Sequence, residues 1–198
     1  MKRQQGRAGE MPAEHALLGL IVLGGGEAYG YDLARHFDAE QPLGAVLRLE
    51  QAMLYQHLKK LERREWLSGS LRQQGSRPPR QMYHVTAAGR AELRRWLEAP
   101  VARTREIRLE FLVKLFIARQ LDPGLARRLV AEQLAISRQH VASLAAAIAQ
   151  PVAPDGATAA ESQDVDFQRL VLDLRLAQTQ AAVAWLEQIA AGETGAPA

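Results

Sequence analysis

Polar and cationic side chains gather on one face of the segment 50–65. Leu54, Leu58 and Leu61 recur at helical spacing, which predicts an amphipathic helix with a buried leucine stripe. Amide, hydroxyl and cationic groups remain for the rest of this helix, and they are carried by Gln51, Tyr55, Gln56, Lys59, Lys60 and Arg63. Such groups can read base edges in the major groove and neutralise phosphates. A plain solvated helix face shows the same pattern, and the helix alone does not separate the two interpretations. His57 beside this face fits a surface histidine better than a phosphate ligand.

A second basic group follows at 75–80, where Arg77 and Arg80 flank Pro78 and Pro79. Gly75 to Pro79 is a turn cluster between two β-prone runs, 67–74 and 80–86, which predicts a hairpin. Prolines restrict the backbone and reduce the entropy lost on docking, so the two arginines could meet phosphates or a narrow minor groove. An ordinary surface turn is the alternative. It is disfavoured by the surrounding charge, because eleven Lys and Arg face four Asp and Glu between Arg48 and Arg95, a net +7 in a chain of net +3.

Other kinds of chemistry find little support in the sequence. The glycines at 24, 26 and 30 approach a dinucleotide-binding pattern, but no strand-helix-strand unit surrounds them, so they fit a turn between helices. The five histidines are scattered without the spacing of a helical metal site. The chain has no cysteine, which excludes disulfides and thiolate chemistry. We expect no catalytic centre, metal or cofactor, and the protein is not expected to be an enzyme.

The elements that must position the two basic groups are mostly helices. Apolar spacing predicts a helix from about residue 12 to the glycines at 24–26, a second at 30–39 and a third at 50–65. The hairpin follows, and Thr86 opens a helix that Pro100 ends. Three helices, a hairpin and a helix form a winged helix-turn-helix plan over residues 12–100, preceded by a flexible tail at 1–11.

The second half of the chain, 101–191, is predicted to be helical throughout. A heptad seam runs through Val130, Leu134, Ser137, Val141, Leu144 and Ile148. Residues 151–164 have loop composition, and a last helix at 165–190 carries one apolar face formed by Phe167, Leu170, Val171, Leu174, Ala181, Trp185 and Ile189. These helices are too few to bury each other, so we expect a homodimer through this half, with a flexible tail at 192–198.

The tryptophans raise the question of a ligand. Trp66 and Trp96 fall where the core of the winged domain is expected, and Trp185 falls on the face of the last helix. Core or dimer packing is the favoured explanation for each. Aromatics that line a dimer cleft would also suit a flat effector, so Trp96 and Trp185 are kept as effector-binding candidates.

Together these segments resemble the PadR family of bacterial transcriptional regulators over about residues 13–100. The resemblance is carried by Gly30-Tyr31 with Leu33, by Leu54-Tyr55 with Leu58 and Leu61-Glu62, and by Arg77-Pro78 through Tyr83, Thr86 and Gly89. The chain departs from the family at Gln56, where a proline is frequent, at Glu65-Trp66, where a glycine is common, and at the doubled Pro78-Pro79. The resemblance implies a winged helix-turn-helix dimer that represses transcription at a palindromic operator, with the C-terminal helices as dimerisation arm and, in some members, an effector site.

The sequence therefore predicts a mainly α, cytoplasmic, homodimeric regulator of transcription, most simply a repressor, that binds double-stranded DNA. The predicted DNA-binding residues are Gln51, Tyr55, Gln56, Lys59, Lys60, Arg63, Arg77 and Arg80. A small aromatic effector would release the DNA. No membrane partner is expected, because the longest apolar run, 16–26, is too short and too rich in glycine to span a bilayer. The alternative is a dimeric adaptor whose basic winged domain docks an acidic protein.

Overall fold

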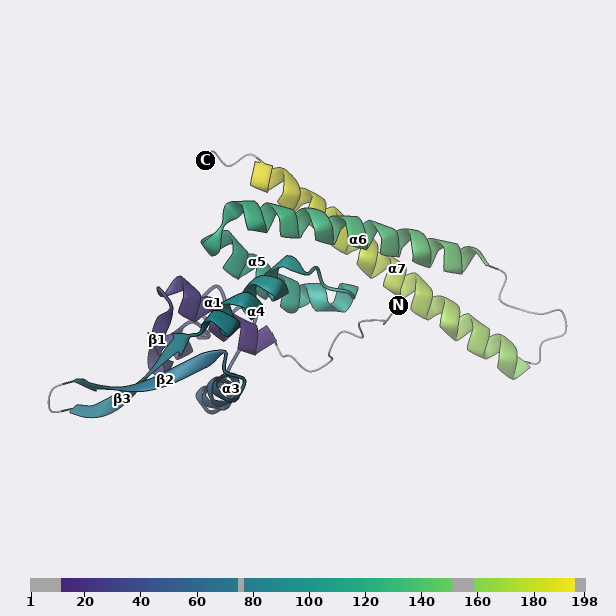
Figure 1. Ribbon diagram of the computed structural model, residues 1–198. Coiled ribbons are helices and arrows are strands. Elements are labelled where there is room, and N and C mark those ends of the chain that lie inside the picture. The colour runs from purple at the N-terminus through teal and green to yellow at the C-terminus, as the bar shows by residue number, and fades with distance from the viewer. Residues whose placement is uncertain (1–11, 75–76, 151–158, 195–198) are drawn as a thin grey trace. The chain divides into compact units, whose positions relative to one another are not determined.

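The computed structural model describes residues 12–74, 77–150 and 159–194 and, of these, all side chains except those of 74, 77, 78, 159–163, 193 and 194. The first half of the chain comprises α1 (Pro12–Leu23), β1 (Glu27–Tyr29), α2 (Gly30–Arg35), α3 (Gln51–Arg63), β2 (Leu67–Gln74), β3 (Arg77–Val85) and α4 (Ala87–Glu98). The second half comprises the 3-10 helix η1 (Thr104–Arg108), α5 (Glu110–Leu121), α6 (Pro123–Ala149) and α7 (Ala159–Thr194), as Figure 1 shows. The predicted winged helix-turn-helix with a helical C-terminal half is confirmed.

The chain forms two compact units. The first comprises Met1–Ala99 and Arg108–Ala126, and the second comprises Pro100–Ile107 and Arg127–Ala198. α5 therefore belongs with the winged helices, although the sequence placed it with the helices of the second half. Gly19 on α1 explains this packing, because a Cβ at that position would lie 2.5 Å from Cδ1 of Ile117 on α5. A side chain at position 19 would require Ile117 to move, so the glycine favours this close approach of the two helices.

The first unit has one hydrophobic core beneath a three-stranded sheet. α1 is buried along most of its length, and Leu17, Leu18 and Ile21 are fully covered. The sheet has the order β1-β3-β2 and is antiparallel throughout. Leu67 and Tyr83 turn inward from the sheet and join the leucine stripe of α3 in this core. A helix covered on nearly all sides is apolar on nearly all sides, which is the composition that α1 has.

The second helix is shorter than predicted. α2 ends at Arg35 instead of Ala39, and the chain continues through turns. Gly44 lies tight against this turn, because a Cβ there would overlap the carbonyl oxygen of Asp38. The close return of the backbone ends α2, and Phe37 and Leu43 bury their side chains beside it.

The end of α3 has an unusual closing residue. The amide of Trp66 donates to the carbonyl of Leu61 (3.0 Å) and that of Glu65 to Glu62 (2.9 Å), which is the Schellman pattern of helix termination. This motif places its penultimate residue in the left-handed region, and Glu65 has a φ of 58°. Glycine is usual at that position because it has no Cβ. The departure from the family at Glu65 therefore does not prevent the helix from ending where the fold requires.

The second unit is built from α6, α7 and the segment 100–107. The side chain of Gln133 on α6 accepts from the amide of Val101 (2.8 Å) and donates to its carbonyl (3.2 Å), and Gln133 is buried. Thr104 and Thr179 share a hydrogen bond of 3.0 Å between their hydroxyls. These contacts hold the segment 100–107 against both long helices. None of the described helices combines the length and the apolar character that crossing a membrane requires.

The long helices follow the predicted apolar patterns only in part. Val130 and Ser137 of the predicted seam are buried, and the other seam positions on α6 are half-buried. α7 begins at Ala159 rather than near Val165, and residues 151–158 of the predicted loop lie outside the described residues. On α7 the predicted apolar face is exposed at Phe167, Leu170, Leu174 and Ala181 and half-buried at Val171, Trp185 and Ile189, whereas Thr179 and Leu186 are buried.

Candidate nucleic-acid interface

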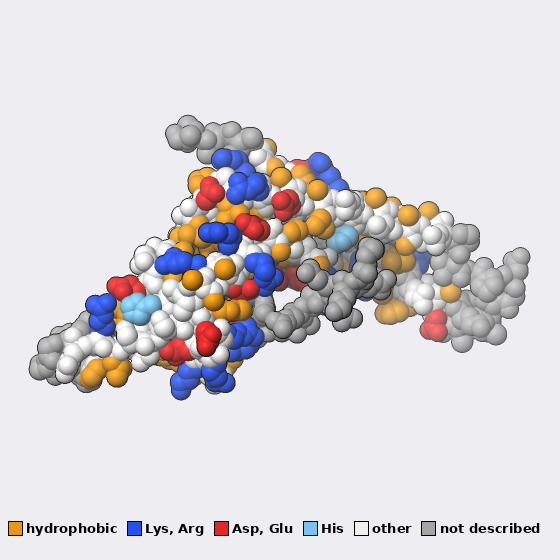
Figure 2. All heavy atoms as spheres, in the orientation of Figure 1, with side chains coloured by type: hydrophobic (Ala, Val, Ile, Leu, Met, Phe, Trp, Pro, Cys, Tyr) orange, Lys and Arg blue, Asp and Glu red, His pale blue; other side chains and the backbone are white. Residues whose placement is uncertain are grey.

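α3 divides its side chains between the core and the solvent as the sequence predicts. Leu54, Leu58 and Leu61 are fully buried. The predicted reading residues Gln51 and Gln56 and the cations Lys59 and Arg63 are exposed. Figure 2 shows Lys and Arg side chains gathered over α3. This outward side has the shape and the charge that the major groove of DNA accepts.

Tyr55 is only half-buried, and its ring is held against the start of α2. A Cβ at Gly30 would lie 2.7 Å from Cε1 of Tyr55, so the glycine makes room for the ring. Burial raises the pKa of the neighbouring Tyr83, and the charge of Glu62 and the proximity of Tyr55 raise it further. The packing against Gly30 holds the Tyr55 ring in one position. A side chain that is already ordered loses less entropy when it binds, which suits a residue that distinguishes between bases.

Lys60 takes a different direction from Lys59. Its ammonium group donates to Oε1 of Glu14 on α1 at 2.5 Å, and Arg64 donates to Oε2 of the same carboxylate at 2.9 Å. His57, with Nδ1 3.4 Å from Glu14, is 6% exposed, so the expectation of a surface histidine is wrong. The sequence could not identify the partners, because Glu14 and His57 are 43 positions apart.

The wing is formed by β2 and β3, and its register explains the doubled proline. Arg72 pairs with Arg80 and Gln74 with Arg77, so β3 has one residue more than β2 between these pairs. Proline has no amide hydrogen for the ladder, and a bulge takes up the interruption. The sequence assigned both prolines to the turn, whereas they lie in β3. Residues 75 and 76 lie outside the described residues.

Of the two predicted arginines of the wing, Arg80 has a described side chain and Arg77 does not. Arg80 is exposed, and it lies directly across from Arg72, which pairs with Glu27 at 3.6 Å. Like charges directly across a sheet repel. An approaching phosphate would relieve that repulsion. Arg77 begins β3, but its side chain lies outside the described residues.

The solvent-facing side of the sheet carries a polar cluster near β1. His84 has Nε2 2.9 Å from the hydroxyl of Ser70 and Nδ1 3.3 Å from Glu27. The cluster is exposed, with 47% of the Glu27 side chain open to solvent. It links all three strands and therefore stiffens the base of the wing.

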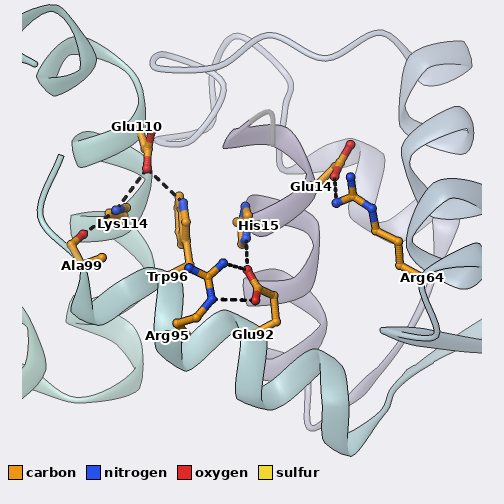
Figure 3. Close-up of polar contacts among 9 residues, drawn as sticks. All are labelled: Glu14, His15, Arg64, Glu92, Arg95, Trp96, Ala99, Glu110 and Lys114. Atoms are coloured by element: carbon orange, nitrogen blue, oxygen red, sulfur yellow. Dashed lines mark hydrogen bonds and ion pairs between the residues drawn. The ribbon is translucent and has the colours of Figure 1, made fainter. Parts of the chain in front are cut away.

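A second polar network surrounds Trp96, and Figure 3 shows its members on α1, α4 and α5. The imidazole of His15 stacks on Trp96 with ring centroids 4.4 Å apart, and the indole nitrogen donates to Glu110 at 3.0 Å. Lys114, almost completely buried, lies 4.9 Å from the ring and 3.1 Å from the Glu110 carboxylate. Trp96 is therefore in contact with protein groups on its faces and its edge. Trp185, the other effector candidate, is half-buried on α7.

Glu92 joins this network to the surface. It binds Arg95 through both carboxylate oxygens (2.5 and 2.9 Å) and lies 3.0 Å from Nε2 of His15. Burial raises the pKa of Glu92, but the hydrogen bonds and charges of Arg95 and His15 outweigh burial, so its pKa lies below the ordinary value. The carboxylate is thus held in its ionised form. The described residues contain no group of His, Asp and Glu that could bind a metal ion.

The geometry defines the class of the molecule. A helix with a solvated, cationic outer side, set beside a basic antiparallel hairpin, is the binding apparatus of a winged helix-turn-helix protein. The transcriptional regulator PadR-like family matches residues 18–95, and the virulence activator alpha C-terminal family matches residues 107–192. Residues 18–95 therefore form a PadR-like domain, and the chain is a DNA-binding transcriptional regulator of the PadR type. That family consists of regulators rather than enzymes.

Two curated relatives cover nearly the whole chain. The probable transcriptional regulator Rv1176c of Mycobacterium tuberculosis is 29% identical over 91% of this chain and 96% of its own. The negative transcriptional regulator PadR of Bacillus subtilis is 29% identical over 90% of this chain and 95% of its own. Solved structures of B. subtilis PadR also match. The complex with operator DNA covers 90% of this chain and 96% of its own (29% identity, TM-score 0.42), and the complex with p-coumaric acid covers 93% and 99% (26% identity, TM-score 0.38).

Proposed function

We propose that this protein is a cytoplasmic, homodimeric repressor that binds a two-fold symmetric DNA site. The observation that carries the proposal is the outer side of α3, where Gln51, Gln56, Lys59 and Arg63 are exposed and their side chains form no hydrogen bond or ion pair with other described residues. In each subunit α3 would enter a major groove, and Arg77 and Arg80 of the wing would bind the adjacent backbone or minor groove. The cations supply affinity for any sequence, and Gln51, Tyr55 and Gln56 supply discrimination.

The second copy is proposed from the second unit. Phe167, Leu170 and Leu174 on α7 are 67%, 66% and 58% exposed, and their spacing places them on one stripe of the helix. A contiguous exposed stripe of large apolar side chains marks a surface for association. A symmetric pairing of this stripe gives the two-fold axis that a palindromic operator requires.

A small aromatic effector is proposed as the signal that releases DNA. Of the two candidates, Trp185 is half-buried and is kept by residue type, because an indole ring stacks well on a flat ligand. Trp96 offers no free ring face, because His15 stacks on it and Lys114 lies over it. Since the B. subtilis relative has been crystallised with p-coumaric acid, a phenolic acid is the first compound to test. Loss of operator binding on its addition, reversed by dialysis, would support release by an effector.

The wing is tested with the double variant Arg77→Ala and Arg80→Ala. We expect it to weaken binding to a random-sequence duplex and to reduce the slope of log K against log salt by about 1.8 per domain, because two phosphate contacts are lost. Fluorescence anisotropy over a series of NaCl concentrations measures both quantities. The matched control is Arg103→Ala with Arg105→Ala, which removes the same charge from exposed positions in the second unit. A slope that falls equally in both variants would contradict the assignment of the wing.

The same titration separates DNA binding from the adaptor hypothesis. A regulator gives a saturable complex with the random duplex at low salt, whereas an adaptor for acidic proteins does not. Sequencing the genomic fragments that the purified protein retains then tests for an operator. A shared palindrome is expected, and fragments without a common sequence would contradict sequence-specific regulation.

A further inference from the structure

α3 and its C-cap residue Arg64 carry two pairs of cations that are chemically matched but lie in different surroundings. Lys59 and Arg63 are exposed, whereas the side chains of Lys60 and Arg64 are 39% and 30% exposed. Each pair has a spacing of four residues, so its members lie together on the helix surface. Adjacent residues of an α-helix point about 100° apart, since 3.6 residues complete a turn. The two pairs therefore face different sides.

The second pair, Lys60 and Arg64, forms ion pairs with a single carboxylate, that of Glu14. Glu14 is fully buried, and the described groups around it come from α3 and its C-cap residue: Lys60 at 2.5 Å, Arg64 at 2.9 Å and Nδ1 of His57 at 3.4 Å. Figure 3 shows Glu14 on α1 and Arg64 at the end of α3 pointing toward one another. Arg64 also lies 5.0 Å from the centroid of the Trp66 ring. The two cations are thus bound on the inner side of the helix.

A phosphate cannot easily remove these cations from Glu14. Pulling them away would leave a buried carboxylate with His57 as its one remaining partner among the described residues. A buried charge without its partners is strongly unfavourable. A DNA phosphate is solvated and can be bound equally well by the exposed Lys59 and Arg63. The competition therefore favours the protein carboxylate for Lys60 and Arg64.

We propose that Glu14 is a positioning residue that divides the cations of α3, holding Lys60 and Arg64 on α1 and leaving only Lys59 and Arg63 for phosphates. The inference rests on the proposed function, in which α3 binds DNA. Two cations withheld from each domain lower the affinity for all sequences alike. Base contacts then carry a larger share of the binding free energy, so Glu14 increases the discrimination between an operator and other DNA. It also fixes the orientation of α3 on α1.

The decisive test compares two neighbouring lysines, Lys59→Gln and Lys60→Gln. Both variants lose one charge from α3, and glutamine at 60 keeps a donor for Glu14, with Arg64 as the remaining counter-charge. Binding of a random-sequence duplex is measured by anisotropy over a series of NaCl concentrations. We expect Lys59→Gln to reduce the salt slope by about 0.9 per domain and Lys60→Gln to leave it unchanged. Thermal unfolding should show the opposite ranking of the two variants. Lys60→Gln should lower the midpoint because it removes an ion pair with the buried Glu14, and Lys59→Gln should leave the midpoint unchanged.

Equal losses of slope in the two variants would overturn the role of Glu14 while leaving DNA binding by α3 intact. If the wild-type protein forms no saturable complex with the duplex, the proposed function fails and this inference fails with it. The two failures are therefore distinguishable in one experiment.

The variant Glu14→Gln tests the same idea from the other side. Without the carboxylate, Lys60 and Arg64 become available, and we expect a steeper salt slope and several-fold tighter binding of the random duplex at low salt. Glu98→Gln is the control, because it removes the same charge from an exposed position at the end of α4. Circular dichroism verifies the fold. Equal slopes in the two folded variants would overturn the proposal, and if Glu14→Gln does not fold, the lysine pair decides.

Discussion

The two compact units differ in how far their large apolar side chains are buried. In the first unit α1, α3, α4, α5 and the sheet bury them in one core, and those left exposed, such as Tyr31, Met53 and Leu71, are scattered over α2, α3 and β2. In the second unit the exposed ones follow one another on α7 at 167, 170 and 174. Scattered apolar residues are normal on a protein surface, whereas a continuous stripe is not. The first unit therefore completes its own core, whereas the second leaves a stripe of large apolar side chains exposed.

The largest effect is expected from substitutions in the exposed apolar stripe of α7, and it is an effect on the affinity of the proposed dimer. Leu170→Glu with Leu174→Glu should weaken the dimer by about 100-fold or more, because each buried leucine contributes about 1.5–3 kcal/mol and 1.4 kcal/mol is a factor of ten. Light scattering at micromolar concentration measures the mass. The control is Leu71→Glu, which changes an equally exposed leucine of the wing and should leave the mass unchanged. A monomeric wild-type protein, or a variant that remains dimeric, would contradict the comparison.

The second prediction uses one substitution in a helix of each unit. A Cβ at Gly89 on α4 would lie 2.2 Å from the carbonyl oxygen of Trp66, whereas a Cβ at Gly192 on α7 meets no described atom within 4 Å. Gly89→Ala should lower the free energy of unfolding by about 1–3 kcal/mol through overpacking. Gly192→Ala should raise it by about 0.5 kcal/mol, since alanine favours helix and the position is in a terminal turn. Urea unfolding at one protein concentration measures both. If both variants changed the free energy of unfolding in the same direction, the proposed difference in packing around Gly89 and Gly192 would be refuted.

A smaller effect is expected from the polar network of the first unit. Glu92→Gln should cost about 1–2 kcal/mol at pH 7, because hydrogen bonds to a charged group are lost. The pKa of Glu92 is lowered in the folded protein, so its ionised form stabilises the fold fully above the ordinary carboxyl pKa. That contribution disappears as the pH falls through the lowered value. Urea unfolding at several pH values should therefore show the two proteins converging below about pH 4. A difference independent of pH would mean that packing, rather than charge, accounts for the loss.

Sequence patterns predicted the elements whose periodicity is local. The leucine stripe of α3 and the two β-prone runs of the wing each depend on neighbours within a few positions, and both are confirmed. The end of α2 was predicted too late, because the turn that stops it depends on Gly44 meeting the backbone of Asp38. The placement of α5 was also not predictable, since it depends on the contact of Gly19 with Ile117 across the unit.

The sequence predicted which polar residues of the candidate site are exposed, but it did not predict which charged residues form ion pairs. The exposed positions of Gln51, Gln56, Lys59, Arg63 and Arg80 follow from local pattern. The partners of the remaining polar groups do not, because Glu14 and His15 stand in the first turn of a helix that appears apolar. Both are fully buried. Their presence in an otherwise hydrophobic run is the one signal that could have indicated buried ion pairs.

The prolines of the wing have a further consequence for how the protein behaves in concentrated solution. β1 pairs with β3 only at residues 82–84, so the outer edge of β3 beyond this point is open. An open strand edge recruits strands from other molecules, and this is a common origin of aggregation. Pro78 and Pro79 lie in this part of β3 and have no amide hydrogens to offer to a further strand. A hairpin that must project toward DNA can therefore remain exposed without adding strands from its neighbours.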